Sequence, residues 1–204
     1  FLSIAYAKDM AGNWIKPGHG IQGRLFEYVS NANLQELHAV TSATPLTAAK
    51  QGSLEDLSHL VLGEIPGSAG ETSGILIICG GLFLIFTRVA NWRTVAGSLG
   101  SAFLFAAVLH HSNSEKFAPA LWHLFAGGLL FGSFFMATDP VSSPITNTGK
   151  WIYGILIGVV TILIRNFTGY VEGVTFAILL GNIAAPIFDE IVVQIRLRRF
   201  QVEA

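Results

Sequence analysis

The sequence predicts an all-α membrane protein with about five transmembrane helices. Its mean hydropathy is +0.56, and charged residues make up only 12% of the 204 residues, whereas an average soluble domain has about 25%. From Thr72 onward apolar segments follow one another, most of them near the roughly 17 to 25 residues that a helix needs to cross a bilayer. Short polar connections join these segments, which predicts a bundle of helical hairpins.

The predicted crossings divide the chain into three parts. Residues 1–71 precede them, residues 72–195 contain them, and residues 196–204 form a basic tail. In chain order, the five crossings are expected at approximately Ser73–Ala90, Thr94–His110, Pro119–Thr138, Lys150–Ile164 and Val171–Ile195.

The part before the crossings has a different character. Its first residues, FLSIAYA, are too short and lack the basic start of a signal peptide. We interpret them as the end of an earlier hydrophobic helix, so the chain is expected to be the C-terminal part of a longer protein. Residues 8–71 are polar and mixed, which predicts a loop or a small extramembrane subdomain.

Small residues within the crossings are assigned to packing. Gly128 and Gly132 are four residues apart, as are Gly154 and Gly158, and this spacing lets helix backbones approach closely in lipid. Cys79, the single cysteine, lies in an apolar run. A disulfide or a thiolate zinc site within this chain is therefore excluded.

The few charges predict the orientation of the bundle. The formal net charge is −1 and no Lys/Arg-rich block is present, so no nucleic acid is expected as a partner. Counting across five crossings places Lys116 and Arg165 on one side and a larger set of cations on the other: Arg88, Arg93, Lys150, Arg196, Arg198 and Arg199. By the positive-inside rule the larger set is cytoplasmic. Residues 38–50, which precede the first crossing, are then expected on the outer side.

Residues 38–50 contain the stretch HAVTSATPLTAAK, which is rich in hydroxyl groups. Thr41, Ser42 and Thr44 flank the small residue Ala43, and Pro45 follows at once. Such a cluster forms a helix cap or turn, because Ser and Thr oxygens accept hydrogen bonds from free backbone N–H groups and proline suits the first helical position. Alternatively, one hydroxyl is the attachment point of a phosphate ester whose charge a helix start stabilises. Composition leaves both interpretations open.

The hydroxyl-rich stretch resembles the flavin-attachment motif of the NqrB/RnfD family, whose members belong to the sodium-pumping NADH:quinone oxidoreductase (Nqr) and to the Rnf complex. In that family FMN is joined through its phosphate to the last threonine of the motif, which matches Thr44. Thr41, Ser42 and Ala43 match the three positions before it, with Ser42 in place of the family's common glycine. The family's usual acidic residue falls on His38.

The resemblance extends over nearly all of the predicted membrane part. It includes IPGSAGETS (65–73), NWR (91–93), FFMATDPVSSPITNTGKW (134–151), GYVEG (169–173) and APIFD (185–189). It implies a fold like the C-terminal half of a ten-helix, inverted-repeat bundle similar to urea channels. Some stretches are more similar to NqrB and others to RnfD, so the subfamily stays open.

The resemblance also implies a function. It implies an electron-transfer subunit of an NADH-linked oxidoreductase complex that carries covalent FMN and couples electron flow to the movement of Na⁺ or H⁺. The implied partners are the other subunits, membrane lipid and, through an upstream half, quinone; riboflavin at a subunit interface is a further cofactor of the family. The implied location is the inner membrane of a bacterial-type cell, with the FMN segment on the outer, periplasmic side. No catalytic triad is visible, so the isolated chain is not expected to catalyse a reaction.

Two acidic residues end apolar runs. Asp139 precedes Pro140, and Asp189 follows Pro186 by three residues. Asp is favoured in turns and at interfaces, but carboxylates and prolines at membrane depth are also typical of transport sites. Asp139 and Asp189 are therefore candidate ligands on a Na⁺ path, with further oxygens from Thr138 and the Ala185 carbonyl. The resemblance implies that acidic residues at both positions take part in sodium handling.

Two other function classes remain open. His110, His111 and His123 lie near the ends of predicted helices, where interfacial hydrogen bonding is the favoured interpretation. The alternative is a membrane anchor that holds a haem between two imidazoles. A passive channel or transporter for small solutes would also suit glycine-rich, broken helices. Of the three classes, only the flavoprotein requires Thr44.

Overall fold

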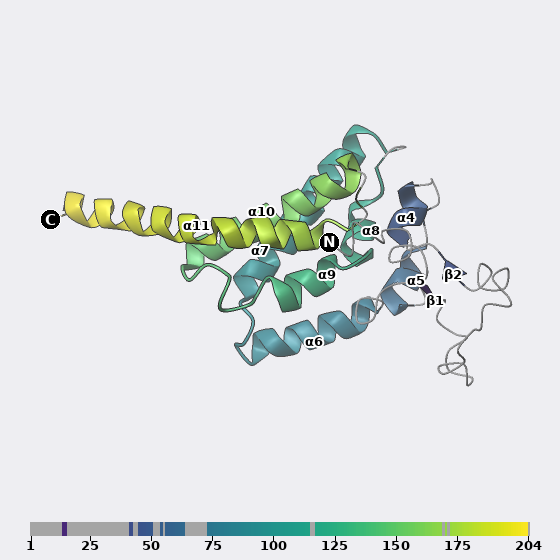
Figure 1. The fold of residues 1–204 in the computed structure, drawn as a ribbon, viewed down its shortest axis with the longest axis horizontal. Helices are drawn as coiled ribbons and strands as arrows, with labels where there is room; N and C mark the ends of the chain where they lie inside the picture. Colours follow the sequence, from purple (N-terminus) through teal and green to yellow (C-terminus); the bar gives the residue numbers. More distant parts are fainter. Residues whose placement is uncertain are drawn as a thin grey trace, which may run out of the picture.

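The computed structural model shows a bundle of helices, most of which run along one common direction (Figure 1). It describes residues 14–15, 41–42, 45–50, 54, 56–63, 73–114, 117–168, 170 and 172–203. Three helices, α7 (Trp92–Ser112), α10 (Asn147–Phe167) and α11 (Val174–Glu203), are long and apolar enough to cross a membrane. The chain is therefore an all-α membrane protein, as the sequence predicted.

Helices α7 and α10 are capped by polar side chains and then pack against each other. The side chain of Asn91 accepts a hydrogen bond from the backbone N–H of Arg93, and that of Thr146 accepts one from Gly149. Along the α7–α10 contact, a Cβ atom added to Gly97 would lie 3.3 Å from Cα of Gly154. Gly154 therefore acts as predicted, because the two backbones meet where side chains are absent.

We expect Gly154→Ala to destabilise the protein by about 1–3 kcal/mol, the usual cost of overpacking. The new methyl group would lie 2.6 Å from the carbonyl oxygen of Thr94 and 3.0 Å from the backbone N of Ser98, and neither backbone atom can rotate away. The matched control is Gly100→Ala on α7, because nothing lies within 4 Å of its added Cβ. Thermal unfolding in detergent measures both variants, and equal unfolding midpoints would contradict this packing.

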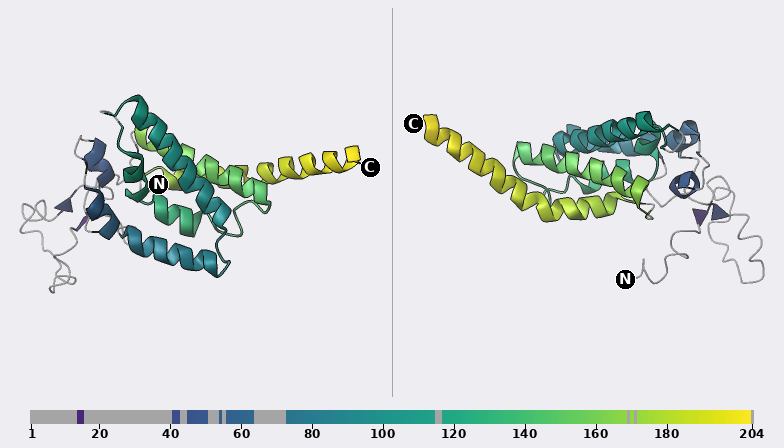
Figure 2. Two further views of the ribbon diagram at one scale, coloured as in Figure 1. Left: turned by 180° about the vertical axis from the view of Figure 1, so that it is seen from behind. Right: turned by 90° about the horizontal axis from the view of Figure 1, so that it is seen from above.

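Helix α11 packs on α10 and continues well beyond it. The hydroxyl of Tyr153 on α10 donates a 2.6 Å hydrogen bond to Oδ1 of Asn182. Figure 2 shows that α11 changes direction along its length, and Pro186 lies inside this helix. A proline kinks a helix because it cannot donate to the carbonyl four residues earlier. Pro186 thus bends α11 but does not break it, and the helix continues through Ile195 to Glu203.

Helix α6 (Gly74–Phe86) is shorter than the crossing predicted there. Its 13 residues span about 20 Å, against the roughly 30 Å of bilayer hydrocarbon. The helix ends where the hydroxyl of Thr87 donates to the carbonyls of Phe83 and Leu84. Arg88 follows in the left-handed conformation, with φ of 61°, so the helix does not reach Ala90.

The segment 119–138 is not the single continuous helix that its apolar sequence predicts. It consists of α8 (Ala120–Phe125), α9 (Leu129–Phe131) and the π-helix η2 (Gly132–Met136). Gly127 separates α8 from α9 with φ of 63°, a conformation that favours glycine. Gly128 and Gly132 lie at the two ends of α9, and the backbone N–H of Gly132 donates a 2.7 Å hydrogen bond to the carbonyl of Gly128. A Cβ atom added to Gly132 would lie 2.6 Å from Cγ2 of Val174, so Gly132 allows close packing against α11.

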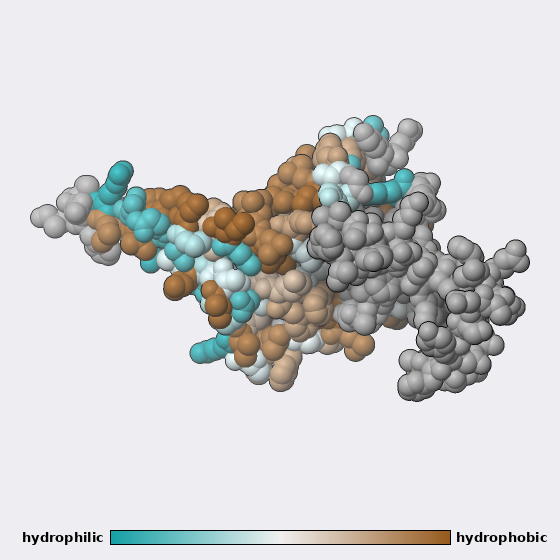
Figure 3. All heavy atoms as spheres, in the orientation of Figure 1, coloured by the Kyte–Doolittle hydropathy of each residue, from teal (hydrophilic) through white to brown (hydrophobic). Residues whose placement is uncertain are grey.

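The remaining described elements lie at one end of the bundle (Figures 1 and 2). These are the antiparallel pair β1 (Trp14–Ile15) and β2 (Thr41–Ser42), and the short helices α4 (Pro45–Lys50) and α5 (Leu57–Leu62). The C-terminal end of α11 lies at the opposite end. Figure 3 shows apolar residues over the middle of the bundle and hydrophilic residues toward the end of α11, as expected of a protein surrounded by lipid.

Candidate functional site

Helix α4 begins immediately after the candidate attachment residue. Thr44 and Ala43 lie outside the described residues, between β2, which contains Thr41 and Ser42, and α4. Pro45 is the first residue of α4, as the sequence predicted for a proline that suits the first helical position. The residue after Thr44 in the sequence is therefore the first residue of a helix whose contacts the structure describes.

Helix α4 is docked on the end of the membrane bundle. Leu46 is buried in one apolar cluster with Leu60 of α5 and with Trp122 and Ala126. Nζ of Lys50 donates to the carbonyl oxygens of Thr168 and Tyr170, at 2.9 and 2.5 Å, just beyond the last residue of α10. Desolvation at this position lowers the pKa of Lys50. These contacts place the residue after Thr44 beside the ends of α8 and α10.

A buried cation lies at the same end of the bundle. Arg165, near the end of α10, is 4% exposed, and its Nη1 donates a 2.7 Å hydrogen bond to the carbonyl oxygen of His123. Its Nη2 lies 3.9 Å from Oε2 of Glu172. Glu172 also accepts a hydrogen bond from the backbone N–H of Gly128. Glu172 thus joins α10 to the start of α9, where Gly128 is the N-cap residue.

Gly127 brings this polar group and α4 together. A Cβ atom added to Gly127 would clash with the carboxylate of Glu172 and with Cδ1 of Leu46. Besides allowing the positive φ, glycine here therefore lets α4 approach the Arg165–Glu172 pair closely. Lys50, Arg165 and Glu172 were not identified as site residues from the sequence, because residues about 120 positions apart meet here.

His123 is the unusual residue of this group. It is 5% exposed, and neither ring nitrogen has a hydrogen-bond partner in the described part of the chain. The sequence favoured interfacial hydrogen bonding for His123, and the structure contradicts that expectation. Buried polar atoms are normally paired. Two buried imidazole nitrogens without a partner in the described chain, beside Arg165 and near α4, therefore suit a hydrogen bond with a polar group of a ligand.

The two candidate sodium ligands lie at the opposite end of the bundle. Oδ2 of Asp139 accepts hydrogen bonds from the hydroxyl and the backbone N–H of Ser142, at 2.8 and 3.0 Å. These bonds lower the pKa of Asp139. The carboxylate of Asp189 accepts from the backbone N–H groups of Ile145 and Thr146 and from the hydroxyl of Thr146. Both carboxylates thus hold the loop that leads into α10.

The oxygen atoms expected beside these carboxylates are only partly in place. The hydroxyl of Thr138 donates to the carbonyl of Phe134, which leaves its oxygen lone pairs as acceptors. The carbonyl that Pro186 leaves without a helical donor is that of Asn182, four residues earlier, and not that of Ala185. Within the described residues, no three His, Cys, Asp or Glu side chains gather closely enough to hold a metal ion.

The length of α10 separates the two candidate sites. Thr146 precedes the first residue of this helix and Thr168 follows its last, so the 21-residue helix holds them about 30 Å apart. Any coupling between the sites therefore acts through the helices and not by direct contact.

Comparison with known proteins finds one matching family. The family described as NQR2, RnfD, RnfE matches residues 1–198. Similar curated relatives include the NqrB subunit of the Na(+)-translocating NADH-quinone reductase of Klebsiella pneumoniae (strain 342), which is 43% identical over 175 residues covering 78% of this chain and 42% of the relative. The corresponding subunits of Ectopseudomonas mendocina and Pseudoalteromonas atlantica are 43% and 38% identical, each over 97% of this chain and 54% of the relative. The chain spans about half the length of the curated relatives it matches.

Proposed function

The chain belongs to the NQR2, RnfD, RnfE family, and from this membership we propose that it acts in a sodium-translocating NADH:quinone oxidoreductase. We propose that it forms part of a membrane subunit of the Nqr type and carries FMN covalently on Thr44. The relatives from Klebsiella, Ectopseudomonas and Pseudoalteromonas, all of them subunits of such a reductase, favour the Nqr type over the Rnf type. Electron transfer and sodium movement are then properties of the whole complex.

The observation that carries the proposal is the docking of α4 on the bundle. The flavin-motif threonine directly precedes Pro45, and the contacts of Leu46 and Lys50 hold this helix against α8 and the end of α10. A cofactor on Thr44 would therefore be tethered to the membrane part and not to a free loop. This fixed attachment supports electron transfer, because the protein positions the cofactor and sets its surroundings.

The residues at this end fit a flavin. Thr44 would hold it through a phosphoester, with Thr41, Ser42 and Ala43 as the rest of the motif. FMN supplies the electron-carrying ring. Lys50 and Arg165 place positive charge near its attachment point, and His123 offers two imidazole nitrogens that lack partners in the described chain. We propose this arrangement on the outer side of an inner membrane, with other Nqr subunits, quinone and interface riboflavin as further partners of the complex.

The test is direct detection of the flavin. The chain is produced with its native flavin-transferring machinery, denatured and separated on a gel, and viewed for flavin fluorescence. Peptide mass mapping then locates the modification. We expect a fluorescent band and the mass of FMN on the peptide that contains Thr44. A dark band with unmodified Thr44 would contradict the proposal and favour a solute channel of the same fold; a violet-edge haem absorption band would instead favour the membrane anchor.

We expect Asp139→Asn and Asp189→Asn to lower sodium-stimulated turnover by about tenfold, a factor typical of coupled sites. Each change removes a negative charge but keeps an oxygen that accepts hydrogen bonds, so the loop before α10 is less disturbed than in an alanine variant. The covalent flavin content is expected to stay unchanged, because α10 separates these residues from α4.

The matched control for the sodium prediction is Glu190→Gln. Glu190 is exposed, adjoins Asp189 on α11 and accepts a hydrogen bond from Gln194. Turnover as a function of Na⁺ concentration is measured in the native complex. Normal turnover in both aspartate variants, or an equal loss in Glu190→Gln, would show that Asp139 and Asp189 only hold the loop.

A further inference from the structure

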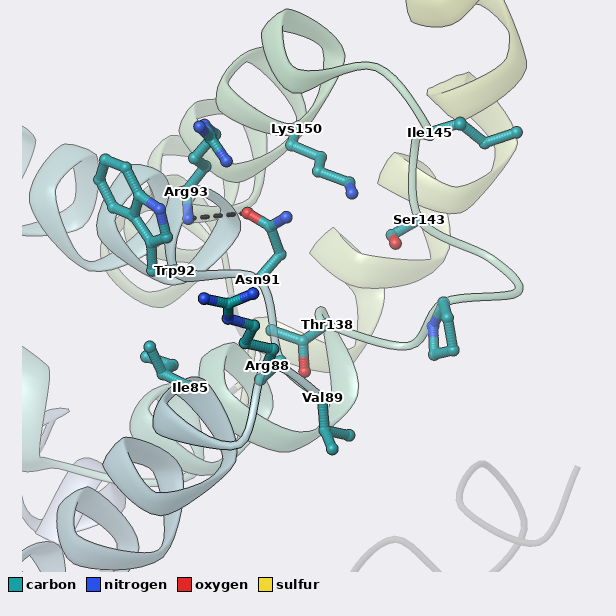
Figure 4. Close-up of a pocket in the computed structure, with 12 residues that line it drawn as sticks. Ile85, Arg88, Val89, Asn91, Trp92, Arg93, Thr138, Ser143, Ile145 and Lys150 are labelled. Carbon is teal, nitrogen blue, oxygen red and sulfur yellow. Dashed lines mark hydrogen bonds between the residues drawn. The ribbon is translucent and has the colours of Figure 1, made fainter.

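A pocket with several cations opens at the end of the bundle opposite to α4. It has a volume of about 490 Å³. The loop between α6 and α7, the loop between η2 and α10, and the first turn of α10 form its wall, and Figure 4 shows Asn91, Thr138 and Lys150 around its hollow. Three of its lining residues, Arg88, Arg93 and Lys150, are cations that come from different positions in the chain.

These three cations lack carboxylate partners in the described part of the chain. The ion pair found there is Arg165–Glu172, at the other end of the bundle. Asp139 accepts hydrogen bonds from Ser142, and Asp189 accepts them from the loop before α10. Lys150 acts on Asp189 electrostatically. Neither aspartate lines the pocket. The pocket therefore has an excess of positive charge.

The backbone conformation of Arg88 is a further feature of this pocket. Among the described non-glycine residues, Arg88 is the one with positive φ, a conformation that Gly or Asn adopts at less cost. Arg88 stands where α6 ends, a position that is usually glycine, so the residue that ends this helix also brings a cation to the pocket. The hydroxyl of Ser143 and the amide of Asn91 supply further polar groups at the pocket wall.

Apolar side chains surround the charged pocket. Ile85, Val89, Trp92 and Ile145 line it, and Val89, Trp92 and Ile145 are exposed. Exposed apolar groups beside cations are typical of the level where lipid headgroups meet acyl chains, and tryptophan is enriched there. A free inorganic anion would use only the cations, whereas a lipid would use both parts of the surface.

We propose that this pocket binds the phosphate headgroup of an anionic phospholipid. Arg88, Arg93 and Lys150 contact the phosphodiester, while the acyl chains lie along Val89 and Ile145. The cation-rich end of the bundle is the end that the positive-inside rule assigns to the cytoplasmic leaflet, where anionic lipids attract basic residues. The proposal is independent of the flavin, because it concerns the other end of the molecule.

The test measures stabilisation of the delipidated native complex by soluble lipids. Thermal unfolding is followed while dihexanoyl-phosphatidylglycerol, dihexanoyl-phosphatidylcholine or inorganic phosphate is titrated, which gives an apparent affinity for each. We expect phosphatidylglycerol to stabilise the complex, and the two other compounds to stabilise it much less. The double variant Arg88→Asn/Lys150→Gln should bind phosphatidylglycerol about 25-fold more weakly, at roughly fivefold for each cation removed.

The matched control is Arg196→Gln/Arg198→Gln, which removes two exposed cations of α11 that do not line the pocket. It is expected to change the affinity less than about twofold. Asn keeps the left-handed backbone at position 88; if the double variant does not fold, Lys150→Gln alone should weaken binding about fivefold. Equal weakening by the control pair, equal stabilisation by inorganic phosphate, or unchanged affinity in the pocket variants would each overturn the proposal.

Discussion

Thr44→Val is expected to abolish completely the covalent flavin attachment proposed for this chain. Valine has nearly the shape of threonine but has no hydroxyl, so no phosphoester can form. The helix that follows is set by Pro45 and by the contacts of Leu46 and Lys50, none of which the substitution removes. Fluorescence of the denatured band and the mass of the peptide measure the loss.

The matched control for Thr44→Val is Thr41→Val, in the same stretch. It removes a hydroxyl of the motif but leaves the proposed attachment atom, so fluorescence should persist even if the yield falls. Retained fluorescence in Thr44→Val, or its loss in Thr41→Val alone, would place the flavin elsewhere. Thr44→Ser provides a second check, because it keeps a hydroxyl and should retain part of the modification.

Arg165→Met is expected to lower the free energy of unfolding by about 2–4 kcal/mol. The guanidinium is buried, donates to the carbonyl of His123 and lies near the carboxylate of Glu172. Methionine fills much of the volume, but it leaves the carbonyl without its donor and the carboxylate without its cation, and both losses are costly in the interior. The 38% exposure of the Glu172 side chain keeps the expected effect below the largest values for buried pairs.

Chemical or thermal unfolding in detergent checks this expectation, with two controls. Arg198→Met removes an exposed arginine of α11 and should change stability by less than about 0.5 kcal/mol. Glu172→Gln keeps an acceptor for the N–H of Gly128 and removes only a partly solvated charge, so its cost should be about 1 kcal/mol or less. If Arg165→Met were no worse than Arg198→Met, the buried guanidinium would not hold α8 to α10.

The long helices were predictable because their signals are local. The crossings predicted at 94–110 and 150–164 correspond to α7 and α10, each of which extends two or three residues further at both ends. Sustained apolarity sets such helices, and Asn91 and Thr146 cap their starts. The segment 119–138 was not predictable in the same way, since apolarity does not distinguish one helix from two short ones and a π-turn separated by Gly127.

The candidate site residues were also predictable from the sequence, whereas the contacts that they make were not. Asp139 and Asp189 stood out in the sequence as acids at the ends of apolar runs, but only the structure shows that each carboxylate receives hydrogen bonds from the loop before α10. The flavin motif is a continuous stretch, so it was visible without a structure. Its support by Lys50 and Leu46 was not visible, because their partners lie far along the chain.

By itself the sequence determined that this is an all-α membrane protein, where its long helices lie, and which threonine is the candidate flavin attachment residue. Hydropathy, helix caps and a short motif are properties of neighbouring residues, so they can be recognised in the chain alone. The tertiary structure alone decided that Arg165 and Glu172 lie beside α4, that the two aspartates lie about 30 Å away along α10, and that Arg88, Arg93 and Lys150 surround one pocket. Each of these depends on which distant segments pack together, and packing is set by shape and close contact across the whole bundle.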